Sequence, residues 1–170
     1  MNDGLGSDPI QTLHFRTGDW ALRFLLLTLA ISPMQRFLKF SAAMRFRRMF
    51  GLFSFFYASL HLMVWLVLDQ SLNLDNMLYD VPESPYIMLG LLAYLMLLPL
   101  AMTSNLASMR ALGAKWQSLH RVVYLIAILG LTHFFWLTKL DISEPLIYAA
   151  VLMVLLAFRW PYFKRFWLNK

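Results

Sequence analysis

The stretch that decides the fold reads His120-Arg-Val-Val-Tyr-Leu-Ile-Ala-Ile-Leu-Gly-Leu-Thr-His133. It lies within Leu119–Leu137, a run long and apolar enough to cross a membrane as a helix. At about 1.5 Å of rise per residue, the two imidazoles lie about 20 Å apart along the helix axis, so they cannot bind one metal ion together. A polar side chain inside a bilayer is costly, and each histidine therefore indicates a functional site with a partner elsewhere in the chain.

The composition is that of a membrane protein. Of 170 residues, 60% are hydrophobic and only 14% are charged, whereas soluble domains carry about 25% charged residues. We therefore expect an all-α integral membrane helical bundle that forms a single domain over residues 1–170. The chain has no cysteine, which excludes disulfides, iron–sulfur clusters and haem held by sulfur. Its scattered glycines form no phosphate-binding loop, so reducing equivalents must come from another protein or molecule.

Five apolar runs predict five transmembrane helices. A loop with four acidic residues separates the second run from the third, and Pro145 suits the first turn of the last helix. The first run stops at Ser32-Pro33 and is short for a span, and Leu13 and Phe15 are candidates to extend it. The five runs are Trp20–Ile31, Met49–Leu68, Tyr86–Met102, Leu119–Leu137, and Pro145 to about Trp160.

The charges predict the orientation. Basic residues favour the cytoplasmic side of short loops, and one orientation places twelve of the fifteen Lys and Arg residues inside and all nine carboxylates outside. The N-terminus is then outside and the C-terminus inside. The net charge of +6 is thus a topology signal, and we expect no binding of nucleic acid.

His61 and His133 are predicted to share one site in the outer half of the membrane. Each lies eight residues before an aspartate, Asp69 or Asp141, on helices that run in the same direction. Two imidazoles at matching depth can ligate one haem iron from opposite faces, and this coordination suits electron transfer rather than oxygen activation.

The inner site is less complete. Superposing His61 on His133 places Arg48 opposite His120, and arginine is a poor iron ligand that pairs well with carboxylates. The inner candidates are therefore His120 with Arg47 or Arg48, or a cofactor other than haem. Thirteen residues turn an ideal helix so that His120 and His133 point about 140° apart. Aiming both into the bundle requires tilt or an irregularity near Gly130.

Other interpretations of these residues stay open. A histidine in a membrane helix can simply form a hydrogen bond to a neighbouring helix, and His120 can be solvated at the membrane boundary. His14 is interpreted as a surface residue, with a further hypothesis that it helps to shape a docking face for a partner. Trp116 is interpreted as part of the interfacial aromatic belt.

With these residues established, the chain resembles the YedZ/MsrQ family, which comprises haem-binding membrane subunits within the ferric-reductase-like transmembrane group. The matching stretches, in order, are Gly4-Leu-Gly-Ser-Asp-Pro9, Thr17-Gly18, Ala21-Leu-Arg-Phe-Leu25, Arg47-Arg-Met-Phe-Gly-Leu52, Tyr57-Ala-Ser-Leu-His61, Thr103-Ser104, Trp116-Gln-Ser-Leu-His120, Tyr124, Ala127-Ile-Leu129, His133 and Pro145-Leu-Ile-Tyr-Ala149.

The resemblance implies a bacterial inner-membrane cytochrome b that is an electron-transfer subunit of an oxidoreductase complex. Electrons would come from the quinone pool or a cytosolic flavin reductase. They would pass to a periplasmic molybdopterin-containing subunit, which reduces methionine sulfoxide in oxidised proteins. The implied cofactors are one or two b-type haems and FMN. The family's haem histidines carry over onto His61, His120 and His133, and its inner-site arginine onto Arg47, with Arg48 adjacent.

Family members typically have a further N-terminal helix, which gives six helices with both ends inside, whereas this sequence begins in what would be the first outer loop. Either the start is truncated or that helix is dispensable. Two rival functions remain. One is a stand-alone transmembrane reductase of ferric iron or another small acceptor, and the other is a helical membrane scaffold without redox activity.

Overall fold

A computed structural model describes residues 8–38, 43–138 and 142–159, and these residues form helices and no strand. Several parts of the chain lie outside the described residues. They are the segment before Asp8, the loop positions Lys39, Lys139 and Asp141, and the basic tail from Trp160 onward. The elements are α1 (Pro9–Leu38), α2 (Ala43–Met63), the π-helix η1 (Val64–Asp69), α3 (Leu74–Glu83), α4 (Pro85–Met102), α5 (Leu106–Leu112), α6 (Ala114–His120), α7 (Val123–Leu137) and α8 (Ser143–Ala157).

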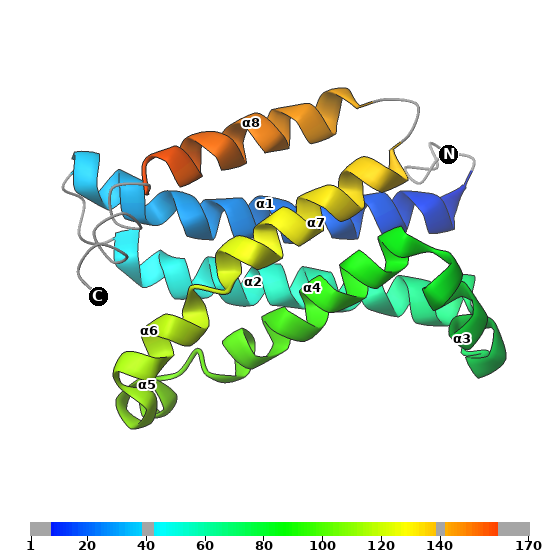
Figure 1. Ribbon diagram of the computed structural model, residues 1–170, viewed down its shortest axis with the longest axis horizontal. Coiled ribbons are helices and arrows are strands. Elements are labelled where there is room, and N and C mark those ends of the chain that lie inside the picture. Colours follow the sequence, from blue (N-terminus) through cyan, green and yellow to red (C-terminus); the bar gives the residue numbers. More distant parts are fainter. Residues whose placement is uncertain (1–7, 39–42, 139–141, 160–170) are drawn as a thin grey trace, which may run out of the picture.

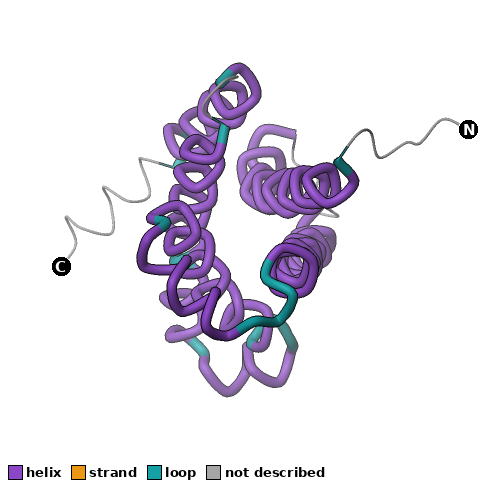
Figure 2. The backbone as a smooth tube through the Cα atoms, turned by 90° about the vertical axis from the view of Figure 1, so that its right-hand side faces the viewer, coloured by secondary structure: helices purple, strands orange, loops and turns teal. Residues whose placement is uncertain are grey.

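The long helices form two antiparallel pairs. Helix α1 packs mainly against α2, and α4 packs mainly against α7, while α8 lies along the outside beside α1 and α7 (Figure 1). Viewed along the helices, the two pairs face each other (Figure 2). The end that carries α3 is called the α3 end below, and the opposite end, which carries α5 and α6, is called the α5 end. Both α2 and α7 run toward the α3 end, as the sequence predicted.

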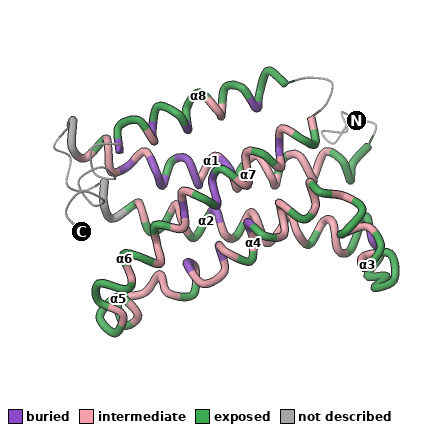
Figure 3. The backbone as a smooth tube through the Cα atoms, in the orientation of Figure 1, coloured by how far each residue is buried: buried purple, intermediate pink, exposed green. Residues whose placement is uncertain are grey.

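The core and the outer surface are both apolar. Leucines of α1 form one buried cluster with residues of α4, α7 and α8, and these helices carry buried positions in Figure 3. Large apolar side chains such as Phe56, Leu95 and Leu125 are nevertheless exposed on the outer faces. A soluble protein rarely exposes contiguous apolar surface of this extent, whereas a lipid-facing helix requires it. The predicted fold class, an all-α membrane helical bundle, is confirmed.

Three helical segments are long and apolar enough to span a bilayer: Phe46–Asp69, Pro85–Met102 and Ala114–Leu137. Helix α8 is apolar but shorter, with Pro145 in its first turn as expected. Helix α1 also runs the length of the bundle, and its Arg23 donates from Nε to the hydroxyl of Tyr148 on α8 at 2.7 Å. That all five helices cross the membrane remains a prediction.

Helix α1 extends beyond the first apolar run at both ends: it includes Leu13 and Phe15, and it continues through Pro33 to Leu38. Proline lacks the N–H that would bond the carbonyl four residues earlier, which here belongs to Leu29. The Nη2 of Arg159 donates to this carbonyl at 2.7 Å. A distant arginine thus supplies the hydrogen bond that the proline removes, and the helix tolerates the proline.

Two expectations need correction. The acidic segment predicted as a loop contains α3, whose N-cap Asn73 accepts hydrogen bonds from the N–H groups of Asp75 and Asn76. The histidine helix is not continuous, because α6 ends at His120 and α7 begins at Val123. The irregularity that reorients His120 relative to His133 therefore lies at Arg121-Val122 rather than near Gly130.

Candidate functional site

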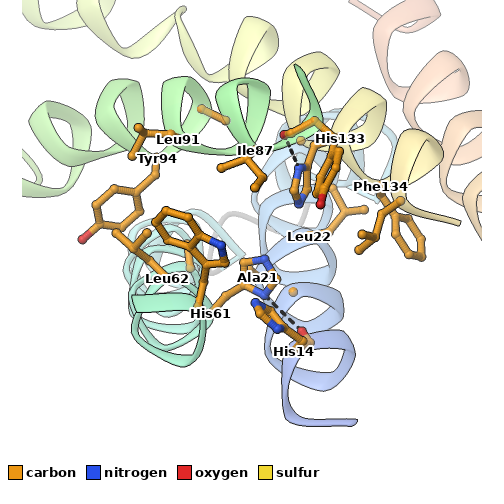
Figure 4. A pocket seen from close by; sticks show the side chains of 18 of the residues that line it. His14, Ala21, Leu22, His61, Leu62, Ile87, Leu91, Tyr94, His133 and Phe134 are labelled. Atoms are coloured by element: carbon orange, nitrogen blue, oxygen red, sulfur yellow. Dashed lines mark hydrogen bonds between the residues drawn. The ribbon is translucent and has the colours of Figure 1, made fainter. Parts of the chain in front are cut away.

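His61 on α2 and His133 on α7 face each other between the two helix pairs near the α3 end (Figure 4). Their ring centroids lie 6.0 Å apart, with the ring planes 84° to each other. The structure thus brings together the two histidines that the sequence paired.

Backbone carbonyls hold both rings. The Nδ1–H of His133 donates to the carbonyl oxygen of Tyr86 at 2.7 Å, and the Nδ1–H of His61 donates to the carbonyl oxygen of His14 at 3.0 Å. A carbonyl only accepts, so both rings carry their proton on Nδ1 when neutral. Each Nε2 then keeps its lone pair for a ligand, as in metal sites whose outer hydrogen bonds fix the tautomer.

The separation of the rings suits one metal ion between them. Two metal–nitrogen bonds of about 2 Å each, together with the distance from each Nε2 to its ring centre, add up to about the observed centroid separation. Among the described residues, no group of three or more His, Cys, Asp or Glu side chains is placed to hold a metal ion. A porphyrin, which brings its own nitrogen ligands, would suit a site of two histidines.

Two glycines make room for the imidazoles. A Cβ on Gly90 would lie 3.0 Å from Nδ1 and Cε1 of His133, and one on Gly18 would lie 3.2 Å from the same atoms of His61. Both distances are too short for comfortable packing, so alanine at either position would displace a ring. The lack of a side chain at Gly18 and Gly90 thus allows the imidazoles of His61 and His133 to take their observed positions.

The histidine pair borders a cavity of about 800 Å³ lined by both helix pairs (Figure 4). Most of its lining is apolar, with Leu22, Leu97 and Phe134 among the residues, and Asp69 and Asp80 also contribute. Pockets for cofactors are typically about 300–1,000 Å³ and apolar with a few polar groups. The cavity, the free Nε2 atoms and the glycines fit a planar, largely apolar group with a metal at its centre.

The interpretation of His14 as a surface residue is wrong. Its side chain is only 18% exposed, and its Nδ1 lies 3.1 Å from Oδ2 of Asp69. Its ring meets that of His61 edge-on with centroids 4.9 Å apart. The sequence holds a signal that a helix begins before His14, because Asp8-Pro9 is a typical helix start, and the N–H of Gln11 donates to Oδ1 of Asp8.

His120 lies at the α5 end in its own polar cluster. The Thr103 hydroxyl donates to the carbonyl of Pro99 at 2.7 Å, so its oxygen accepts from Nε2–H of His120 at 3.1 Å. Trp116 stacks on His120 with centroids 3.9 Å apart and donates from Nε1 to the Thr103 carbonyl. Trp116 therefore positions His120 in addition to any role in an interfacial belt.

The two candidate arginines differ in their surroundings. Arg47 is partly buried and lies within electrostatic range of His120 and Arg159, whereas Arg48 is exposed. The structure thus brings Arg47, rather than Arg48, close to His120. Neither His120 nor Arg47 lines the cavity beside His61 and His133.

Fold and site together define a helical membrane protein with a histidine pair poised to bind a metal-centred cofactor. The model of the ferric reductase like transmembrane component family matches residues 17–131. The chain belongs to this family and, within it, to the MsrQ subunits, as its similarity to curated relatives shows.

Two such relatives carry the name protein-methionine-sulfoxide reductase heme-binding subunit MsrQ. The one from Xanthomonas euvesicatoria pv. vesicatoria is 47% identical over 158 residues, which cover 93% of this chain and 72% of the relative. The one from Bordetella pertussis is 46% identical over 160 residues, which cover 93% of this chain and 78% of the relative. No solved structure matches the chain.

Proposed function

We propose that this chain is the haem-binding, electron-transferring membrane subunit of a methionine sulfoxide reductase system. The observation that carries the proposal is the pairing of His61 with His133 across the cavity, with both Nδ1 atoms committed to carbonyls. The names of the relatives support the assignment to this reductase system.

In this proposal His61 and His133 would hold the iron of a b-type haem through Nε2. When bound, haem supplies reversible one-electron oxidation and reduction of its iron. The carbonyls of His14 and Tyr86 would keep the two rings oriented for ligation. The apolar walls exclude water, which limits side reactions and sets the polarity around the site.

The direction of transfer and the partners are further parts of the proposal. The excess of basic residues at the α5 end favours a cytoplasmic location for that end, with a cytoplasmic C-terminus and a periplasmic N-terminus in the inner membrane. Electrons would then enter near His120 and Arg47 from quinone or a flavin reductase, with FMN and a second haem as candidate inner cofactors. They would leave near His61 and His133 to a periplasmic molybdopterin-containing subunit, where methionine sulfoxide is reduced.

The test begins with a spectrum of the purified protein. Reduction with dithionite should give the split absorption bands of a b-type haem, and the reduced protein should be reoxidised by the molybdopterin-containing reductase in the presence of methionine sulfoxide. Absence of haem bands would overturn the proposal. Equally fast reoxidation by ferric chelates without the partner would favour the stand-alone reductase that the family model's name suggests.

A further inference from the structure

A local change of helix type brings Asp69 toward His61. Eight residues of an α-helix make about 2.2 turns, which would leave Asp69 about 80° away from His61 around the axis. Residues Val64–Asp69 instead form the π-helix η1, and the N–H of Gln70 donates to the carbonyl of Trp65, five residues earlier, at 3.0 Å. Because a π-turn contains more residues than an α-turn, the eight residues come closer to two whole turns. Asp69 and His61 accordingly line the same cavity.

One face of α1 lies against the His61 ring. It carries His14, Thr17 and Gly18, which are neighbours on a helix surface at spacings of three and four residues. The His14 carbonyl accepts from Nδ1–H of His61 at 3.0 Å, the Thr17 hydroxyl lies 3.4 Å from the same nitrogen, and Gly18 leaves room for the ring. The His14 ring also meets the His61 ring edge-on, with centroids 4.9 Å apart. Residue 14 thus contacts His61 with both its backbone and its side chain.

Asp69 holds His14 in this position. The Nδ1 of His14 lies 3.1 Å from Oδ2 of Asp69, and a hydrogen bond to a carboxylate is stronger than one between neutral groups. His14 lies in the second turn of α1, which begins at Pro9. Helix ends fray, so a fixed position for residue 14 requires a contact with another element. The contact with Asp69 ties the start of α1 to the end of η1.

We propose that Asp69 is a positioning residue for His61: by holding His14 it keeps the carbonyl of residue 14 on Nδ1–H of His61, and so lowers the midpoint potential of a haem bound there. A hydrogen-bond acceptor on the outer nitrogen of a ligating histidine raises the basicity of that ligand. A more basic ligand stabilises ferric iron more than ferrous iron, because ferric iron carries the larger positive charge. The lower potential makes the reduced haem a better electron donor. The inference deepens the proposed function and rests on it for the haem.

The experiment measures the midpoint potential of the haem in the detergent-purified full-length chain, by redox titration followed by absorbance. Asp69→Ala, His14→Ala and the double variant are compared with the wild type. Asp75→Ala is the matched control for the loss of charge at the α3 end, because Asp75 is exposed in the first turn of α3. We expect both single variants to raise the potential, by about threefold or more in the ratio of reduced to oxidised haem at one ambient potential. The double variant should match His14→Ala, because the two residues act as one unit.

A potential in Asp69→Ala no higher than in Asp75→Ala would overturn the inference. A further rise in the double variant beyond His14→Ala would also overturn it, since Asp69 would then act on the iron directly through its charge.

If Asp69→Ala loses its haem, Asp69→Asn decides the same comparison, because asparagine keeps the size of the side chain and one accepting oxygen. Loss of haem from both Asp69 variants would overturn the inference, since Asp69 would then be needed for the fold of the site. A wild type without haem would overturn the proposed function itself, whereas a haem-containing wild type with unshifted Asp69 variants would overturn this inference alone.

Discussion

The Nδ1 of His133 lies 2.7 Å from the carbonyl oxygen of Tyr86, and this bond joins α7 to the start of α4. A ring held in this way presents Nε2 to the cavity, where His61 lies opposite. The orientation of each ligand thus depends on backbone groups, which substitution of a neighbouring side chain does not remove.

These Nδ1-to-carbonyl hydrogen bonds predict different effects on haem content when His61, His133 and His14 are substituted. His61→Ala and His133→Ala should each abolish the haem of this site, because each removes one of the two side chains that would hold the iron. His14→Ala should retain most of that haem, since His61 is bonded to the backbone carbonyl of residue 14. Haem per chain, measured by pyridine haemochrome on purified protein, checks the three variants. Full haem content in His61→Ala would refute the pairing.

The two glycines beside the imidazoles give a second prediction. Gly90→Ala and Gly18→Ala should weaken haem retention by about tenfold or more, as loss of a ligand's outer support does elsewhere, because each new Cβ would push a ring. Gly51→Ala is the matched control, since its Cβ would meet Thr28 at an ordinary 3.8 Å. Haem loss to an excess of apomyoglobin measures retention, and equal rates in all three variants would contradict the account.

The third prediction concerns the proline in α1. Arg159→Gln should destabilise the bundle by about 1–3 kcal/mol, the cost of leaving a buried carbonyl without a partner, here that of Leu29. Adding Pro33→Ala restores an N–H four residues after Leu29 and should recover part of the lost thermal stability. Melting of the single and double variants in one detergent is the measurement. A double variant no more stable than Arg159→Gln would argue against this compensation.

The fourth prediction separates the two ends of the protein. Thr103→Val removes the hydroxyl that accepts from His120 while keeping the size of the side chain. The midpoint potential of a cofactor bound beside His120 should shift. The absorbance spectrum and midpoint potential of the haem between His61 and His133 should stay as in the wild type. Redox titration followed by absorbance checks this, and a shift at the His61–His133 haem would mean that the two ends are not independent.

The histidine pair could be predicted from the sequence because its signal is local. Each ligand is a polar residue in an apolar run, and each lies at the same distance from an acidic residue that marks the membrane boundary. Depth in the membrane follows directly from such counting along a helix. The fold class and the direction of the two helices followed from the same pattern.

The remaining contacts depend on tertiary structure. His14 acts through its backbone carbonyl, which no residue type reveals, and Arg159 reaches Leu29 across 130 residues of sequence. The continuation of α1 through Pro33 could not be predicted without that arginine. The break at Arg121-Val122 likewise has no Gly or Pro to mark it.

The central claim is that His61 and His133 together ligate one haem iron. The most direct measurement is the electron paramagnetic resonance spectrum of the oxidised, purified protein, compared with those of His61→Ala and His133→Ala. The account predicts a low-spin ferric signal in the wild type that disappears in both variants. An unchanged low-spin signal in either variant, or a wild type with only high-spin iron, would contradict it.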